Sequence, residues 1–150
     1  GSEMCIRDSF YEGTKTYIYE VFEQLGRIPA NLVIPVGNGT LFLGAIYALE
    51  DLQNSGVIDH FPQIIALQSQ NCDPLLRAAA QGAAEPAAVT PTPTIAEGIA
   101  IGKPMRGEEI LANWPAFSAK FALVKPKSSD VKALLGHRSR SAAELRVQAQ

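Results

Sequence analysis

The chain has 150 residues, of which 47% are hydrophobic, a size and composition typical of one globular domain with a sizeable core. The formal net charge of −2 argues against a protein that binds nucleic acid through phosphate contacts. The apolar runs are too short to cross a bilayer, no secretory signal is present, and the two cysteines form neither a disulfide framework nor a metal-ligand pattern. We therefore expect a cytoplasmic protein with no membrane partner, no nucleic-acid partner and no metal site.

The first nine residues show no hydrophobic periodicity and join abruptly to a well-patterned segment. Residues 1–9 are similar to the in-frame translation of a sequencing adapter. We interpret them as an artefact in front of a truncated natural sequence that resumes at Phe10. The alternative is an ordinary disordered N-terminus.

Helix and strand patterns then alternate. Apolar residues recur at helical spacing over Thr14–Leu25, and Gly26 is a C-terminal stop signal. The continuous apolar run Leu32–Val36, rich in β-branched residues, predicts a strand buried in a parallel sheet rather than a half-exposed one. A Gly-Asn-Gly-Thr sequence ends this strand and leads into a second amphipathic helix, predicted over Thr40–Asn54.

The same alternation continues after the second helix. We predict a strand at Gln63–Gln68 and a helix that starts at Asp73-Pro74, an N-cap followed by proline at the first helical position. Residues 82–93 have the composition of a surface loop, and residues 94–101 fit either a short strand or a turn. Residues 107–113 begin another helix, with acidic residues in its first turn. This order predicts an α/β fold with a parallel sheet.

Charge is distributed unevenly along the chain. Up to Asn113 there are 6 Lys and Arg against 13 Asp and Glu, a local charge of −7. From Trp114 onward there are 7 against 2, a local charge of +5. We interpret residues 10–113 as the structured domain and residues 114–150 as a basic tail that is either divergent or read in a shifted frame.

The turn Gly37-Asn38-Gly39-Thr40 is the first candidate binding site. A strand, a glycine-rich turn and a helix together direct backbone N–H groups and a helix N-terminus toward an anion, although a plain turn needs glycine too. The turn lacks the lysine of a P-loop. The third glycine of the dinucleotide fingerprint would be Gly44, two positions late, which argues against a nucleotide.

Four motifs follow one another in order. The first is Glu12 to Thr16 (EGTKT) with Tyr19-Glu20, and the second is Pro35 to Thr40 with Leu43-Gly44. The third is Ile58 to Pro62 with Gln68 and Pro74-Leu75, and the fourth is Thr94 to Ile99 (TIAEGI). Over about Phe10 to Leu111, this order resembles threonine synthases within the fold-type II pyridoxal-phosphate enzymes, and the fourth motif is shared with related dehydratases.

The resemblance implies a partial fold-type II domain with three αβα layers and pyridoxal 5'-phosphate as cofactor. Gly37, Asn38, Gly39 and Thr40 would hold the cofactor phosphate, and Gly98 would face the pyridine ring. The Schiff-base lysine of the family would lie upstream of this segment, and Lys15 belongs to a different motif. We therefore assign no catalytic residue and expect this chain alone to be inactive. The parent enzyme would be a homodimer acting on a small amino-acid substrate.

The other reactive side chains have simpler interpretations. We expect the remaining lysines near and beyond the fourth motif to be solvated surface charges: Lys103, Lys120, Lys125, Lys127 and Lys132. His60 and His137 lack companions for a metal or a triad, and Cys72 is expected to be an inert buried thiol. Beyond Asn113 the family pattern predicts a strand and a helix, but Trp114-Pro115 stands there instead.

Three functions stay open at this stage. The first is a fragment of a lyase resembling threonine synthase, which converts O-phosphohomoserine and water to threonine and phosphate. The second is a threonine or serine dehydratase, although the EG-x-KT segment favours the synthase. The third is a non-catalytic α/β module that binds a small phosphorylated ligand.

Overall fold

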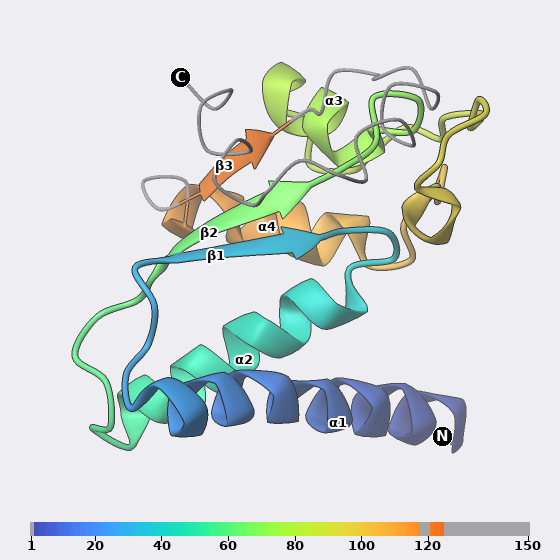
Figure 1. Ribbon diagram of the computed structural model, residues 1–150. Helices are drawn as coiled ribbons and strands as arrows, with labels where there is room; N and C mark the ends of the chain where they lie inside the picture. The colour runs from blue at the N-terminus through green and yellow to red at the C-terminus, as the bar shows by residue number, and fades with distance from the viewer. Residues whose placement is uncertain (1, 118–120, 125–150) are drawn as a thin grey trace.

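The computed structural model describes residues 2–117 and 121–124 (Figure 1). In chain order the elements are α1 (Ser2–Leu25), β1 (Asn31–Pro35), α2 (Thr40–Asn54), β2 (Gln63–Leu67), α3 (Pro74–Gln81), the short 3-10 helix η1 (Glu97–Ile99), α4 (Gly107–Phe117) and β3 (Phe121–Val124). Helix α2 has its predicted bounds, and β1 and β2 lie within one residue of theirs. The segment predicted as a strand or a turn before α4 contains the single turn η1.

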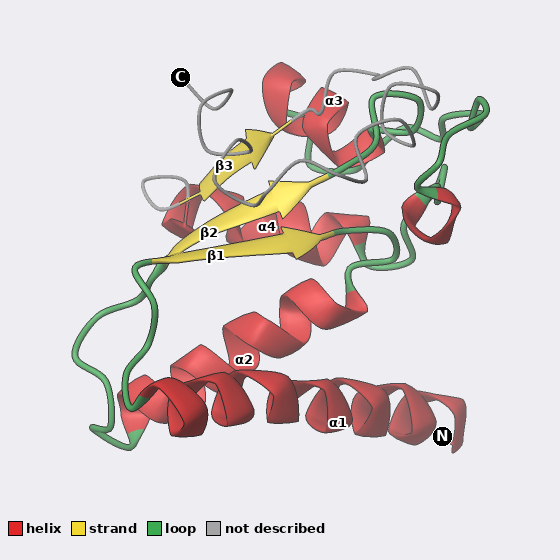
Figure 2. Ribbon diagram, in the orientation of Figure 1, coloured by secondary structure: helices red, strands yellow, loops and turns green. Residues whose placement is uncertain are grey.

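The three strands form one parallel sheet in the order β1-β2-β3 (Figure 2). Leu32 pairs with Ile64, and the pairing continues just past β1, where the Val36 N–H donates to the Leu67 carbonyl oxygen at 2.9 Å. In the view of Figure 1, α1 and α2 lie below the sheet and α3 lies above it. Parallel strands between helices confirm the predicted α/β class.

Strand β1 is half-exposed, so the prediction of a fully buried strand is wrong. Leu32 and Ile34 are buried in the core, but Val33 between them is 59% exposed. A parallel strand is buried on both faces only when both faces are covered. Within the described residues β1 is an edge strand, and one of its faces remains open.

Helix α1 begins at Ser2, earlier than the predicted start at Thr14. No proline stands between Ser2 and the end of the helix at Leu25, and each residue added to a formed helix gains a backbone hydrogen bond. Hydrophobic periodicity marks the part of a helix that packs, and a helix extends beyond that part until a residue such as Gly26 ends it (φ +63°).

The α/β order continues past Asn113, where the sequence pattern suggested that it stops. Helix α4 includes Trp114-Pro115 and ends at Phe117, and β3 then pairs in parallel with β2. The four residues of β3 are too few for a clear strand signal. That residues 114–150 form a divergent or frameshifted tail stays a prediction, since most of them lie outside the described residues.

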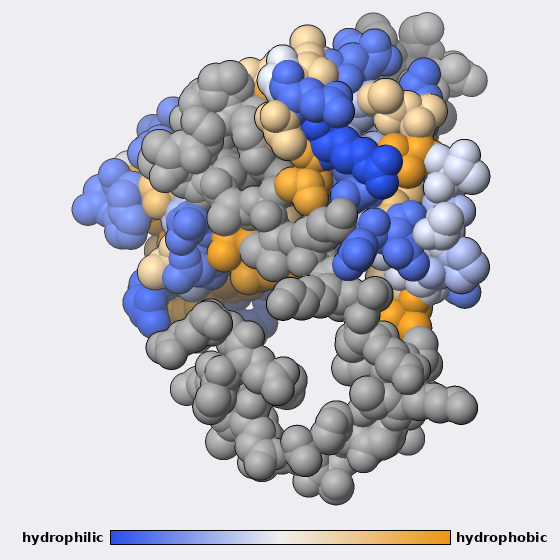
Figure 3. Space-filling model, turned by 90° about the horizontal axis from the view of Figure 1, so that it is seen from above, coloured by the Kyte–Doolittle hydropathy of each residue, from blue (hydrophilic) through white to orange (hydrophobic). Residues whose placement is uncertain are grey.

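Seen from above, the described residues on this face are mostly hydrophilic, and the hydrophobic ones form small separate groups (Figure 3). Among the described helices, none combines the length and the apolar character that a membrane span needs.

Candidate functional site

The predicted anion site lies at the C-terminal end of β1, where the chain turns into α2 (Figure 1). In open α/β sheets, ligands bind outside the carboxyl ends of the strands. Gly39 is the N-cap of α2 and has φ +89°, a left-handed conformation that costs glycine little and other residues more. The bend therefore depends on the glycine that the motif supplies.

Several backbone N–H groups of this turn form no hydrogen bond within the described residues. In the part of the chain that the structure describes, the backbone N–H groups of Gly37, Asn38, Gly39 and Thr40 have no protein acceptor. The first turn of α2 contains no acidic side chain, so the partial positive charge of the helix N-terminus is not compensated there. Open donors and a helix N-terminus together favour an anion such as phosphate.

Gly98, which the family resemblance assigns to the cofactor ring, lies beside this turn. A Cβ atom on Gly37 would lie 3.2 Å from the Cα atom of Ile99, 3.1 Å from Ile101 Cγ1 and 3.5 Å from the carbonyl oxygen of Gly98. The η1 segment thus packs directly against the start of the loop. A Cβ atom on Gly98 would meet no atom within 4 Å, so the space next to Gly98 is open.

Helix α4 supports the loop from another side, which the sequence analysis missed. A Cβ atom on Gly39 would lie 2.4 Å from Ile110 Cδ1, and Ile110 is only 2% exposed. Gly39 therefore has two reasons to be glycine, its backbone conformation and the side chain packed against it. No local pattern at Gly39 signals a contact with a residue so far along the chain.

A polar network fixes the first turn of α4 against α1 and α2. The Tyr47 hydroxyl donates to the Glu109 carboxylate, and Arg106 Nη1 donates to the other Glu109 oxygen at 2.7 Å. The Arg106 guanidinium lies over the Tyr11 ring, 4.3 Å from its centroid. Burial, and then the bond to Glu109, raise the pKa of Tyr47, so its hydroxyl remains a donor at neutral pH.

The EG-x-KT segment joins α1 to α2. The Lys15 ammonium contacts Asp51 at 2.9 Å and Glu12 at 3.0 Å, and the Tyr19 hydroxyl also donates to Asp51 at 2.8 Å. The bond to Asp51 raises the pKa of Lys15, and the bonds from Lys15 and Tyr19 lower the pKa of Asp51. Lys15 is therefore a charged, paired residue with a structural role.

A second contact in this segment brings the two helices close together. A Cβ atom on Gly44 of α2 would lie 2.2 Å from Thr14 Oγ1 and 2.8 Å from Thr14 Cβ. Thr14 Oγ1 donates to the Tyr11 carbonyl oxygen at 2.9 Å and lies 3.4 Å from the Thr40 carbonyl oxygen. Thr14 thus contacts Thr40, which is both the first residue of α2 and the last residue of the loop.

The other reactive side chains lie apart from the loop. Cys72 is fully buried, and desolvation raises the pKa of its thiol, as expected for an inert cysteine. His60 is exposed and pairs with its neighbour Asp59. His137, Lys120, Lys125, Lys127 and Lys132 lie outside the described residues. Within residues 2–117 and 121–124, no three His, Cys, Asp or Glu side chains form a group that could hold a metal ion.

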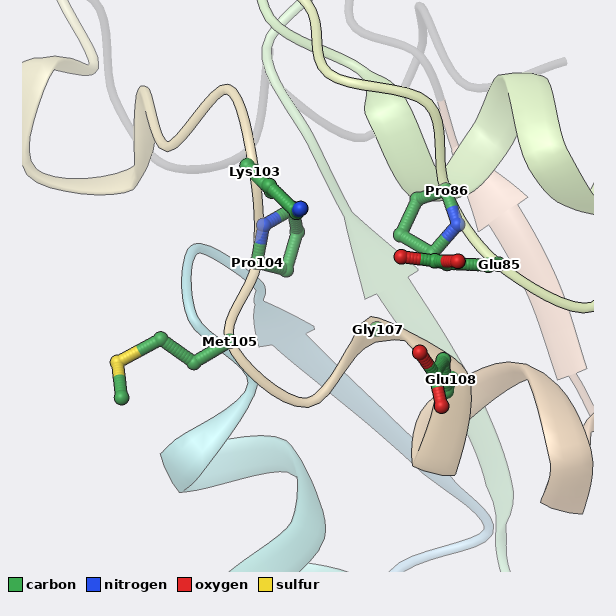
Figure 4. A pocket seen from close by; sticks show the side chains of 7 residues that line it. All are labelled: Glu85, Pro86, Lys103, Pro104, Met105, Gly107 and Glu108. Atoms are coloured by element: carbon green, nitrogen blue, oxygen red, sulfur yellow. The ribbon is translucent and has the colours of Figure 1, made fainter.

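A surface pocket is present between the loop after α3 and the start of α4, lined by Glu85, Pro86, Lys103, Pro104, Met105, Gly107 and Glu108 (Figure 4). Lys103 and Glu85 come from opposite sides of the opening, and Met105 points away from it. None of the five predicted cofactor-binding residues lines this pocket. It is thus separate from the glycine-rich loop.

Comparison with known proteins identifies the family. The family model for "Pyridoxal-phosphate dependent enzyme" matches residues 5–128, a range that starts before Phe10 and ends after Asn113. Two curated relatives are both named threonine synthase. The protein from Methanocaldococcus jannaschii is 28% identical over 101 residues, and that from Methanosarcina acetivorans is 30% identical over 105. Each match covers 67% of this chain, which spans only 25% of each relative's length.

Solved structures support the fold. The chain is similar to maize serine racemase (TM-score 0.55, 20% identity, 77% of this chain and 32% of that one). It is also similar to threonine deaminase isoform 2 from Solanum lycopersicum (TM-score 0.54, 18% identity, 77% of this chain and 30% of that one). A third similar structure is an L-serine ammonia-lyase from Rhizomucor miehei (TM-score 0.54, 21% identity, 82% of this chain and 35% of that one). At these identities the similarity shows a shared fold.

Proposed function

Because this chain belongs to the family of pyridoxal-phosphate-dependent enzymes, we propose that its glycine-rich loop holds the phosphate of pyridoxal 5'-phosphate. The residues are Gly37, Asn38, Gly39 and Thr40, with Gly98 beside the cofactor ring. The observation that carries the proposal is the set of four backbone N–H groups without a protein acceptor in the described residues, at the N-terminus of α2.

The chemistry of the loop fits this group. A phosphate accepts several hydrogen bonds and is stabilised by the positive end of a helix. The Thr40 hydroxyl adds a side-chain donor. Gly98 leaves open space where a side chain would intrude, which suits the approach of a flat ring. The residues present therefore match both the anionic and the planar parts of the cofactor.

This chain supplies anchoring and orientation. When bound, pyridoxal phosphate withdraws electrons from the α-carbon of an amino-acid substrate. The loop would hold the phosphate, and the η1 segment would set the place of the ring. We assign no proton-transfer step to these residues: Lys15 is held by Asp51 and Glu12, and Lys103 is an exposed residue of the separate pocket.

For the complete protein, we propose a lyase reaction of the threonine synthase type, in which O-phosphohomoserine and water give threonine and phosphate. This would place it in threonine biosynthesis, within amino-acid metabolism. The names of the two curated relatives and the EG-x-KT segment support this choice. The alternative is a dehydratase-type reaction on threonine or serine, which the names of the structural neighbours suggest. A cytoplasmic location and a homodimeric parent stay predictions.

Binding to the loop can be tested on the chain itself. Pyridoxine 5'-phosphate is a suitable probe, because it lacks the aldehyde that reacts with any exposed lysine, and pyridoxine is its phosphate-free control. We expect the phosphorylated probe to shift the backbone amide resonances of residues 37–40, and pyridoxine to leave them in place. Thr40→Val should weaken binding by roughly tenfold, since it removes a hydrogen bond to a charged group. Unshifted loop resonances at saturating probe would contradict the phosphate site.

The reaction is tested in a complete polypeptide that contains this chain. Release of inorganic phosphate and threonine from O-phosphohomoserine is expected. Release of ammonia and a 2-oxo acid from threonine or serine, without turnover of O-phosphohomoserine, would instead establish the dehydratase alternative.

A further inference from the structure

Gln68 is a buried polar residue whose side chain connects α3 to the residue that follows β1. It directly follows β2 and is 1% exposed. Its Oε1 atom accepts hydrogen bonds from the backbone N–H groups of Leu75 and Leu76 in the first turn of α3, both at 3.1 Å. Its Nε2 atom donates to the carbonyl oxygen of Val36, the residue that follows β1, over 3.4 Å.

An amide side chain is required for this set of bonds. Because Oε1 faces two backbone donors, Nε2 is the atom that remains for the Val36 carbonyl oxygen. A glutamate at this position would accept from α3 but could not donate to Val36 when ionised. A methionine of similar length would do neither.

The bond to Val36 acts on the first donor of the loop. The Val36 carbonyl and the Gly37 N–H belong to one peptide unit, and no described peptide bond is cis. In a trans peptide the N–H points opposite to the C=O. A donor that holds the carbonyl on one side therefore directs the Gly37 N–H to the other. The preceding peptide is also held, because the Val36 N–H donates to Leu67 at 2.9 Å.

We propose that Gln68 is a positioning residue for the phosphate loop, and that it orients the Gly37 N–H toward the bound anion. Its role toward an anion rests on the proposed phosphate site, whereas its effect on the Val36–Gly37 peptide does not. The side chain is anchored at α3 by its two shorter bonds, so α3 serves as the fixed point from which the end of β1 is held.

Two variants of the full chain separate the contributions of this side chain. When its carboxyl group is ionised, Gln68→Glu keeps the acceptor for α3 and removes the donor to Val36, whereas Gln68→Met removes both and adds no charge. Gln63→Glu is the matched control, since it makes the same change at an exposed position of β2, the strand that Gln68 follows. Near-ultraviolet circular dichroism checks that each variant is folded.

The first measurement needs no ligand. We expect the Val36 carbonyl ¹³C and the Gly37 amide resonances to move in both Gln68 variants and to stay in place in Gln63→Glu. The second is a titration with inorganic phosphate. Both Gln68 variants should bind it about fivefold more weakly than the wild type, the size expected for one neutral hydrogen bond. If Gln68→Met loses as much phosphate affinity as Gln68→Glu, the loss cannot come from repulsion between a carboxylate and the phosphate.

The outcomes separate the two proposals. Unmoved Val36 and Gly37 resonances in a folded Gln68 variant overturn the positioning role, whether or not phosphate binds. Moved resonances with wild-type phosphate affinity overturn it too, because the orientation would then not matter to the anion. A wild-type chain that does not bind phosphate contradicts the proposed function. In that case the Val36 and Gly37 resonances alone decide whether Gln68 orients the Val36–Gly37 peptide.

Discussion

Replacing Gly39 with alanine should destabilise the chain through two separate effects. Gly39 has φ +89°, and a residue with a Cβ atom pays about 1–2 kcal/mol in a left-handed conformation. The new Cβ atom would also lie 2.4 Å from Ile110 Cδ1 in the core, and overpacking of this kind costs about 1–3 kcal/mol. Alanine restricts the unfolded chain, which offsets about 0.5 kcal/mol. We therefore expect a loss of about 2–4 kcal/mol.

Urea unfolding followed by circular dichroism measures this loss, with Gly56→Ala as the matched control. Gly56 also has a positive φ, +71°, but a Cβ atom there would meet nothing within 4 Å. Its replacement should cost only the backbone term, about 1 kcal/mol. With an m-value of about 1–3 kcal/mol per molar urea, the difference between the two variants should be visible in the transition midpoint.

The contribution of Ile110 can be isolated in a double-mutant cycle. Ile110→Val deletes the Cδ1 atom that the new Cβ would meet, at a cost of about 0.5–1.5 kcal/mol by itself. Combined with Gly39→Ala, it should recover about 1 kcal/mol or more of the overpacking cost. Equal losses for Gly39→Ala and Gly56→Ala, together with additive behaviour in the cycle, would refute the argument that α4 limits the space at the loop.

Three further predictions concern the helix contacts and the thiol. Gly44→Ala should lower the unfolding free energy by about 1–2 kcal/mol despite the better helix propensity of alanine. Adding Thr14→Ala should recover only part of this loss, because the Thr14 Cβ atom also lies within 2.8 Å of the new Cβ. A Gly44→Ala chain that is more stable in urea titration would count against the close helix contact. Asp51→Asn should cost less than about 1 kcal/mol at pH 7, since the pair with Lys15 lies near the surface. Because the folded-state pKa of Asp51 is lowered, this stability should be present above the ordinary aspartate pKa and disappear as the pH falls through the lowered value. An equal stability difference between variant and wild type at pH 7 and in strong acid would argue against this contribution of the ion pair. Cys72 should stay unmodified by iodoacetamide at pH 8 until urea unfolds the chain, as mapped by peptide mass spectrometry, and rapid labelling of the native chain would contradict its burial.

Much of the fold could be predicted because its signals are local. The apolar spacing of α2, the β-branched run of β1 and the proline at the start of α3 each act within one element. The α/β order can therefore be predicted from the amino-acid sequence. The glycines at Gly37 and Gly39 likewise mark a turn with special backbone requirements. The position of Gly98 beside that turn came from the family resemblance, because no local pattern connects the two segments.

Tertiary contacts decided what the sequence left open. Val33 is exposed because β1 is an edge strand among the described residues, and hydrophobicity alone does not say which face of a strand is covered. Lys15 of α1 forms an ion pair with Asp51 of α2 because the packing of the two helices places these side chains next to each other.

The amino-acid sequence alone located the glycine-rich loop and explained why its turn needs glycine. Only the tertiary structure showed what surrounds the loop, with Ile110 packed against Gly39 and Gln68 bound to Val36. Backbone conformation depends on neighbours along the chain, whereas packing and buried hydrogen bonds depend on residues that folding brings together.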